Sequence, residues 1–159
     1  MKIVGRTNRK NVNSLSLKFY SNYEGGDCAR RDCYKLIDAS TNKGILPDLI
    51  FSDFFSFSPT KKYILLARDF NGREAIYELT LFDNEAGILY SMHLLAHGTT
   101  SVKNIDWVSD CQFSFQGKLL TDEEVIPGVL RAKDGRFTVL IENKAGEIST
   151  LIKVANTHS

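Results

Sequence analysis

The sequence predicts an all-β protein, built either as a β-sandwich or as an open, propeller-like antiparallel meander with at most one or two short helical turns. Two observations predict this class. Runs rich in aromatic and β-branched residues alternate with turn-forming residues roughly every 8 to 12 positions, a spacing typical of sandwiches or barrels. No stretch places apolar residues three and four apart with polar residues between, as an amphipathic helix requires. We expect about ten to twelve strands in a single domain, residues 1–159.

Residues 53–92 form the centre of this prediction, because they are typical of four short strands joined by tight turns. Pro59 ends the first strand, since proline lacks a backbone donor. Residues 63–67 (Tyr-Ile-Leu-Leu-Ala) are apolar at every position, which indicates a strand covered on both faces. Asn71-Gly72 then predicts a hairpin, because both residues tolerate a positive φ.

The flanking strands follow from alternation. Residues 1–13 predict an edge strand followed by a loop, and Leu15, Leu17 and Phe19 alternate with polar residues as in a half-buried strand. Further strands are expected at residues 34–37, 75–82, 88–92, 105–107, 111–115, 129–132, 137–142 and 147–154.

Three polar stretches interrupt the C-terminal strands. Gln116-Gly117 and Lys133-Asp134-Gly135 are expected as turns, the second because Asp-Gly favours tight hairpins. Thr121 and Glu124 have the spacing of a capping box, which predicts one turn of helix.

Composition narrows the protein class. Of 159 residues, 43% are hydrophobic, which indicates a folded chain. No apolar run reaches the ~18 residues that span a membrane, and no apolar segment follows the basic N-terminus as in a signal peptide. We therefore expect a cytoplasmic protein with no membrane partner.

Charge is distributed unevenly along the chain. Residues 1–47 carry nine Lys and Arg against four Asp and Glu, whereas residues 48–124 carry six against twelve. Residues 125–159 carry five against three, so the whole chain has a net charge of +1. Such asymmetry steers association with charged partners, although surface charges also occur wherever solvent permits.

The histidines and cysteines predict no metal site and no cofactor. His93 and His97 share one face of a strand, but a metal centre needs further ligands at suitable spacing. Cys28 and Cys33 are expected in a loop, and whether they ever pair stays open. Cys111 alternates with Phe113 and Phe115, which predicts a core thiol. With no nucleophile elbow or phosphate-binding loop either, we predict no catalytic residue and no enzyme.

One basic and aromatic segment has the residue types that bind single-stranded nucleic acid. Acidic residues (Glu24, Asp27 and Asp32) interrupt it, and we do not predict nucleic-acid binding. The basic and aromatic members are Lys18, Tyr20, Tyr23, Arg30, Arg31, Tyr34 and Lys35.

The segment from Phe57 to Gly87 is similar to one blade of a β-propeller, whose blades repeat every ~40 to 45 residues. With its small size and lack of catalytic motifs, the chain resembles the immunity proteins of bacterial polymorphic toxin systems, including contact-dependent growth inhibition. The resemblance implies a non-catalytic protein that forms a heterodimer with a cognate protein toxin, expected to be a nuclease domain, and occludes its active site. A generic propeller-like interaction module or a subunit of a larger assembly is the alternative.

If the resemblance holds, acidic residues at strand ends and turns are expected to meet the basic cleft of the toxin. An aromatic anchor, Tyr77 or Trp107, is expected to supply much of the binding energy. The acidic candidates are Asp69, Glu74, Glu78, Asp83, Glu85, Asp106 and Asp110.

Overall fold

Twelve strands and no helix make up the part of the chain that the computed structural model describes, which comprises residues 1–7, 14–20, 33–45, 51–71, 76–97, 102–121 and 133–155. The predicted all-β class is confirmed. None of these residues belongs to a helix that is long and apolar enough to cross a membrane. The strands are β1 (Lys2–Arg6), β2 (Leu15–Tyr20), β3 (Cys33–Asp38), β4 (Lys43–Gly44), β5 (Phe51–Phe57), β6 (Tyr63–Asn71), β7 (Ile76–Asp83), β8 (Ile88–His97), β9 (Val102–Ser109), β10 (Gln112–Thr121), β11 (Lys133–Lys144) and β12 (Glu147–Ala155).

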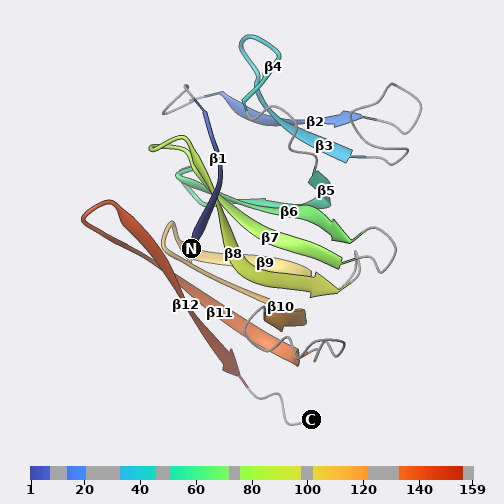
Figure 1. Ribbon diagram of the computed structural model, residues 1–159, viewed down its shortest axis with the longest axis vertical. Coiled ribbons are helices and arrows are strands. Elements are labelled where there is room, and N and C mark those ends of the chain that lie inside the picture. The colour runs from blue at the N-terminus through green and yellow to red at the C-terminus, as the bar shows by residue number, and fades with distance from the viewer. Residues whose placement is uncertain are drawn as a thin grey trace.

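The strands form one antiparallel meander that bends into three layers (Figure 1). Its path runs β12-β11-β10-β8-β7-β6-β5-β3-β2, with β1 beside β8, β4 beside β3 and β9 beside β10. We call β6, β7 and β8 the central layer; β2, β3 and β4 lie on one side of it, and β9 to β12 form the C-terminal layer on the other. The fold therefore joins the two predicted architectures, an open meander and stacked sheets.

The central layer is apolar on both faces, as residues 63–67 predicted. Ile64, Leu65 and Leu66 are each 0% exposed although they are consecutive, so neighbouring side chains are buried on opposite faces of the sheet. One face meets β2 and β3 in the N-terminal core, whose buried members are Leu15, Leu36, Ile45, Ile64, Leu66, Phe82 and Leu89.

The other face of the central layer meets the C-terminal layer in the larger C-terminal core. Three stacked rings run through it, with centroids 6.0 Å apart between Phe113 and Phe115 and 5.4 Å apart between Phe115 and Phe137. Its buried members are Tyr63, Leu65, Ala67, Leu79, Leu81, Tyr90, Met92, Phe113, Phe115, Phe137, Val139, Ile141 and Ile148.

β8 changes partners where the layers meet. Its first half pairs with β1 and its second half, Leu94 to Ala96, pairs with β10. Between the halves its register against β7 shifts, because Leu79 faces Leu94 whereas the next residue, Thr80, faces Ser91. Extra residues in one strand of a pair bend that strand, so the shift turns the meander from the central layer into the C-terminal layer.

Two predicted turns prove to be strand. Gly117 lies inside β10, and Lys133 to Gly135 begin β11, where Gly117 faces Gly135. The prediction was wrong because pairing between two long strands overrode the local turn preference of Asp-Gly and Gln-Gly. Thr121 ends β10, and the remainder of the predicted helical turn lies outside the described residues, as do the predicted strand 129–132 and Gly72.

Replacing Phe113 with alanine is expected to lower the free energy of unfolding by about 3 to 5 kcal/mol, because the change removes a fully buried ring. The matched control is Val108→Ala on the adjoining strand. That side chain is 69% exposed, so its loss is expected to stay within about 0.5 kcal/mol. Urea unfolding followed by circular dichroism measures both values, and equal losses would contradict the placement of Phe113 in the core.

Candidate functional site

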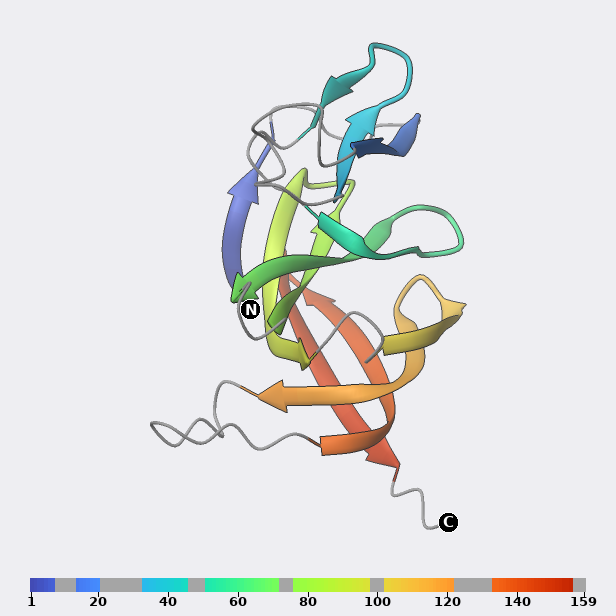
Figure 2. The same ribbon diagram turned by 90° about the vertical axis from the view of Figure 1, so that its right-hand side faces the viewer.

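Three turns meet at one end of the central layer, and we call them the turn cluster: residues 58–62, 83–87 and 109–111. The backbone N–H of Asn84 donates to the carbonyl of Lys62 at 2.9 Å. Thr60 donates to Asp110 from its backbone N–H at 3.0 Å and from its hydroxyl at 2.6 Å. Figure 2 shows the turn between β5 and β6 directly above the turn between β9 and β10. The cluster therefore ties the C-terminal layer to the central layer.

The turn at residues 58–62 is fixed by its own sequence. Pro59 has a preset φ, and Lys61 is the left-handed residue of the turn, with a φ of 61°. The buried Ser58 hydroxyl accepts the backbone N–H of Tyr63 at 3.0 Å, and the Ser58 N–H donates to the carbonyl of Tyr63 at 2.9 Å. This turn holds Thr60 and Lys62 in place for their partners in the other two turns.

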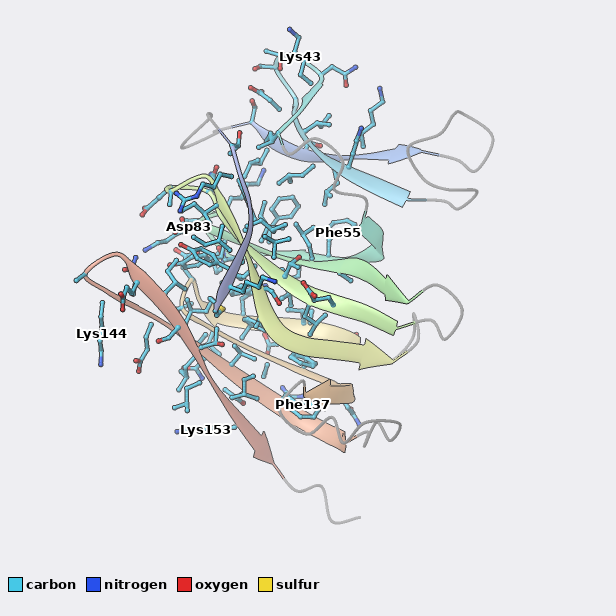
Figure 3. The ribbon with its side chains drawn as sticks, in the orientation of Figure 1. Lys43, Phe55, Asp83, Phe137, Lys144 and Lys153 are labelled. Atoms are coloured by element: carbon cyan, nitrogen blue, oxygen red, sulfur yellow. The ribbon has the colours of Figure 1, made fainter. Side chains whose placement is uncertain are left out.

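Asp83 is buried, with 3% of its surface exposed, and it organises the turn between β7 and β8. Its Oδ1 accepts the backbone N–H groups of Glu85 at 3.0 Å and Ala86 at 3.2 Å. Burial raises the pKa of Asp83, while the two N–H groups and the Lys62 charge partly oppose that rise. Figure 3 labels Asp83 at this end of the central layer. Its carboxylate is thus engaged within the turn rather than presented to solvent.

Two buried tyrosines lie near Asp83. Burial raises the pKa of the Tyr63 hydroxyl far above its usual range, and the negative charge of Asp83 raises it further. Burial also raises the pKa of Tyr90, with a smaller contribution from Asp83 and an opposing one from Arg6. Both hydroxyls therefore stay protonated at neutral pH.

Asp110 is the half-buried carboxylate of the turn between β9 and β10. Partial burial raises its pKa, but hydrogen bonds from Thr60 and Ser58 and the charge of Lys62 outweigh that effect and hold the pKa below its usual value. Asp110 is consequently ionised at neutral pH, with its orientation fixed by Thr60.

Glu85 and Lys62 form an ion pair at the surface of the turn cluster. Their side chains lie 3.9 Å apart and are 59% and 29% exposed, respectively. The Lys62 ammonium also lies 5.4 Å from the centroid of the Tyr63 ring. An exposed ion pair of this kind stabilises a protein little, so Glu85 can exchange Lys62 for a partner's cation at small cost.

Among the described side chains of the C-terminal layer, the most exposed apolar one lies on β9, next to two carboxylates. Phe113 of β10 faces Trp107 and Gln112 faces Ser109, so Val108 has no cross-strand partner in this bulge. Val108 is 69% exposed as a result, between the exposed Asp106 and the half-buried Asp110. Alternation of polar and apolar residues did not predict the exposure of Val108, because a bulge breaks the two-residue period.

We call Asp106, Val108 and Asp110 the exposed strip of β9, and Trp107 anchors this strip to the rest of the structure. Its indole N–H donates to the Ser56 hydroxyl at 2.8 Å, and its ring centroid lies 4.6 Å from that of Phe113. The ring is half-buried against the C-terminal core. Its contacts join β9 to β5 and to the core, which fixes the strip relative to the turn cluster.

The structure brings some predicted residues together and places others elsewhere. Asp83, Glu85 and Asp110 meet at the turn cluster, and Asp106 with Trp107 lies next to it along β9. Glu78 is 8% exposed and lies five positions from Asp83 along β7, about 16 Å away. The Asp69 and Tyr77 backbones face each other in β6 and β7, their side chains lie outside the described residues, and so does all of Glu74.

Cys111 differs from its predicted core position. β10 begins at Gln112, so Cys111 belongs to the preceding turn and is exposed. Its backbone is held on both sides, because its N–H donates to the Ser109 hydroxyl at 3.1 Å and its carbonyl accepts the Ile141 N–H at 2.8 Å. Among the described residues no group of three His, Cys, Asp or Glu side chains could hold a metal ion. The His93 and His97 side chains are outside the described part.

Comparisons of this chain with protein-family models, with curated proteins and with solved structures found no match.

Replacing Asp83 and Asp110 individually with asparagine is expected to change the pH dependence of stability in opposite directions. The folded pKa of Asp83 is raised, so its stabilising contribution is complete below about pH 3.9 and is lost as the pH rises through the folded pKa. The folded pKa of Asp110 is lowered, so its contribution is present above about pH 3.9 and is lost as the pH falls.

As the pH rises, wild type should therefore lose stability relative to Asp83→Asn and gain stability relative to Asp110→Asn. Urea unfolding between about pH 3 and pH 7 gives both differences. Slopes of the same sign for the two variants would contradict the different environments assigned to these carboxylates.

Proposed function

We propose that the protein is a non-catalytic binding protein that neutralises a cognate protein toxin by occluding its active site, the toxin being a nuclease domain. The supporting observation is the exposed strip on β9, where Val108 is 69% exposed between Asp106 and Asp110. An apolar contact surrounded by carboxylates suits a partner surface that combines a hydrophobic patch with Lys and Arg side chains.

Rigid presentation favours tight binding by this strip. Asp110 is oriented by two hydrogen bonds from Thr60, and Trp107 is held by Ser56 and Phe113. Side chains that are already ordered lose less conformational entropy when a partner binds. The partner therefore meets a preformed surface.

The charge of the strip suits a nuclease. A nuclease cleft attracts phosphates with basic side chains, and the carboxylates of Asp106, Asp110 and Glu85 would occupy that cleft in their place. The sequence between residues 48 and 124 carries six Lys and Arg against twelve Asp and Glu, so it supplies the negative charge although the whole chain is close to neutral. Attraction of this kind accelerates encounter, and contact at Val108 would slow dissociation.

The same strip would also serve a generic interaction module or a subunit of a larger assembly. The two functions differ in what binding achieves. A toxin-neutralising protein abolishes the activity of its partner at a one-to-one molar ratio, whereas an adaptor leaves that activity intact. Enzyme inhibition by the purified protein therefore separates them.

Charge reversal at Asp106 and Glu85 is expected to weaken toxin binding about tenfold for each substitution, mainly through slower association, because it places lysine against a basic cleft. The probe is the toxin domain encoded directly upstream, since immunity genes follow their toxin genes. Surface plasmon resonance measures the rates, and a nuclease assay measures inhibition.

The matched control for charge reversal is Glu142→Lys on β11, because Glu142 is also exposed, at 49%, and also lies beside a lysine, Lys144, at 3.7 Å. It is expected to bind as wild type does. Unchanged binding by the Asp106→Lys and Glu85→Lys variants, or an upstream domain that wild type neither binds nor inhibits, would contradict the proposed function.

Val108→Ala is expected to raise the dissociation rate of the same complex by about fivefold to tenfold, because two methyl groups leave the interface. Association should be unchanged, since the substitution carries no charge. Ile3→Ala provides the control, because Ile3 is also exposed, at 42%, but lies on β1. Equal effects of both substitutions on dissociation would exclude Val108 as an anchor.

A further inference from the structure

β12 is the longest uninterrupted edge strand among the described residues. Of the described strands it pairs with β11 alone, through nine consecutive residue pairs from Arg136 with Ala155 to Lys144 with Glu147, and it shows no register shift. Figure 1 shows it at the margin of the C-terminal layer with no ribbon beyond it. Natural proteins protect such edges with bulges, prolines, short strands or charged side chains. β12 has no bulge or proline between Glu147 and Ala155, and its two charged side chains, Glu147 and Lys153, have opposite signs.

The turn before β12 determines which backbone groups face outward. Ala145 and Gly146 have φ values of 55° and 84°, which define a two-residue hairpin turn closed by a hydrogen-bonded pair of Lys144 and Glu147. Hydrogen-bonded pairs alternate along an antiparallel ladder. The N–H and C=O groups of Ile148, Thr150 and Ile152 therefore point away from β11, toward the open edge.

We propose that this edge pairs with β12 of a second copy of the chain, in an antiparallel arrangement whose twofold axis passes Thr150. Thr150 then faces Thr150 of the second copy, and Ile148 faces Ile152. All three residues have outward backbone groups, so each pair would exchange two hydrogen bonds. An interface formed by the same strand of both copies closes as a symmetric dimer.

Side-chain charges select this register. It places Glu147 of each copy directly opposite Lys153 of the other, so the symmetric interface contains this attractive pair twice. Figure 3 labels Lys153 near the end of β12 and Lys144 at the turn that precedes it. Moving the register by one hydrogen-bonded step would place Lys153 opposite Ser149 and Glu147 opposite Ala155, which removes both attractions.

The apolar side chains favour the same register. Ile148 is buried in the C-terminal core, and Ile152 is half-buried against it. Pairing Ile148 with Ile152 across the twofold axis extends this core from one copy into the next. The central threonine pair is also a favourable cross-strand combination.

The other edges of the meander lack these properties. β1 has five residues and a register shift between Ile3 and Gly5. β9 has two register shifts, and β2 has six residues. Among the described edge strands, β12 alone combines length, regular pairing and self-complementary charges.

The test is the mass of the full chain as a function of concentration, measured by analytical ultracentrifugation. Wild type is expected to form a dimer, and Thr150→Pro is expected to remain a monomer, because it removes an outward N–H without breaking a bond to β11. Circular dichroism checks that the variant folds. A wild type that stays monomeric up to about 0.1 mM would overturn the proposal.

Charge exchange provides a second test that does not depend on proline. Glu147→Lys and Lys153→Glu are each expected to weaken the dimer by about tenfold, because either one places like charges opposite each other twice. The double variant restores opposite charges and is expected to dimerise as wild type does. Glu142→Lys, on β11, is the control and should leave the dimer unchanged.

Absence of rescue in the double variant, or a dimer that persists in Thr150→Pro, would show that another surface forms the dimer and would overturn the proposal. The result is independent of toxin binding. A Thr150→Pro monomer that still inhibits the toxin supports both inferences, whereas a dimer that binds no toxin supports this inference and contradicts the proposed function.

Discussion

The structure depends on one constraint, which is that the central strands are apolar on both faces. Ile64, Leu65 and Leu66 are consecutive and each is 0% exposed, so a single covering layer would leave alternate residues in water. Each such side chain contributes about 1.5 to 3 kcal/mol when it is buried. The chain before the central layer and the chain after it therefore both have to return to it, and they form its two covers.

Covering both faces with one continuous meander requires strands that change partners. Along one edge, β8 and β10 each pair with one strand in their first half and with another in their second half. The register shift opposite Leu79 and Thr80 and the bulge at Val108 both occur in strands that connect or border layers. Irregular pairing is thus a consequence of the three-layer arrangement. The exposure of Val108 in the candidate binding strip results from one such irregularity, the bulge in β9.

The sequence predicted the parts of the fold that local chemistry determines. It identified the all-β class, the doubly covered strand at residues 63–67 and the turn after Ser58, because alternation and proline act within a few residues. It did not predict that Gly117 and Gly135 pair inside long strands, that Cys111 is exposed or that the Val108 side chain is exposed in a bulge. These features depend on which strands pair and in which register, and a period of two residues contains no information about that choice.

The candidate site was predictable to a similar extent. Acidic residues in turns were visible in the sequence, but their roles differ with burial. The buried Asp83 accepts the backbone N–H groups of Glu85 and Ala86 in its own turn, whereas Asp110 is fixed by Thr60, fifty positions away along the chain. Only tertiary pairing distinguishes these two carboxylates.

The two proposed interfaces lie on opposite edges of the C-terminal layer, in which the strands run in the order β9, β10, β11 and β12. A second copy paired along β12 would extend this layer and leave β9 at both outer ends, so neither interface blocks the other. Both result from the same property of the layer. Its inner face packs into the C-terminal core, and the two proposals therefore place association with another macromolecule at its edges, where β9 offers carboxylates beside Val108 and β12 offers outward-facing backbone groups beside Glu147 and Lys153.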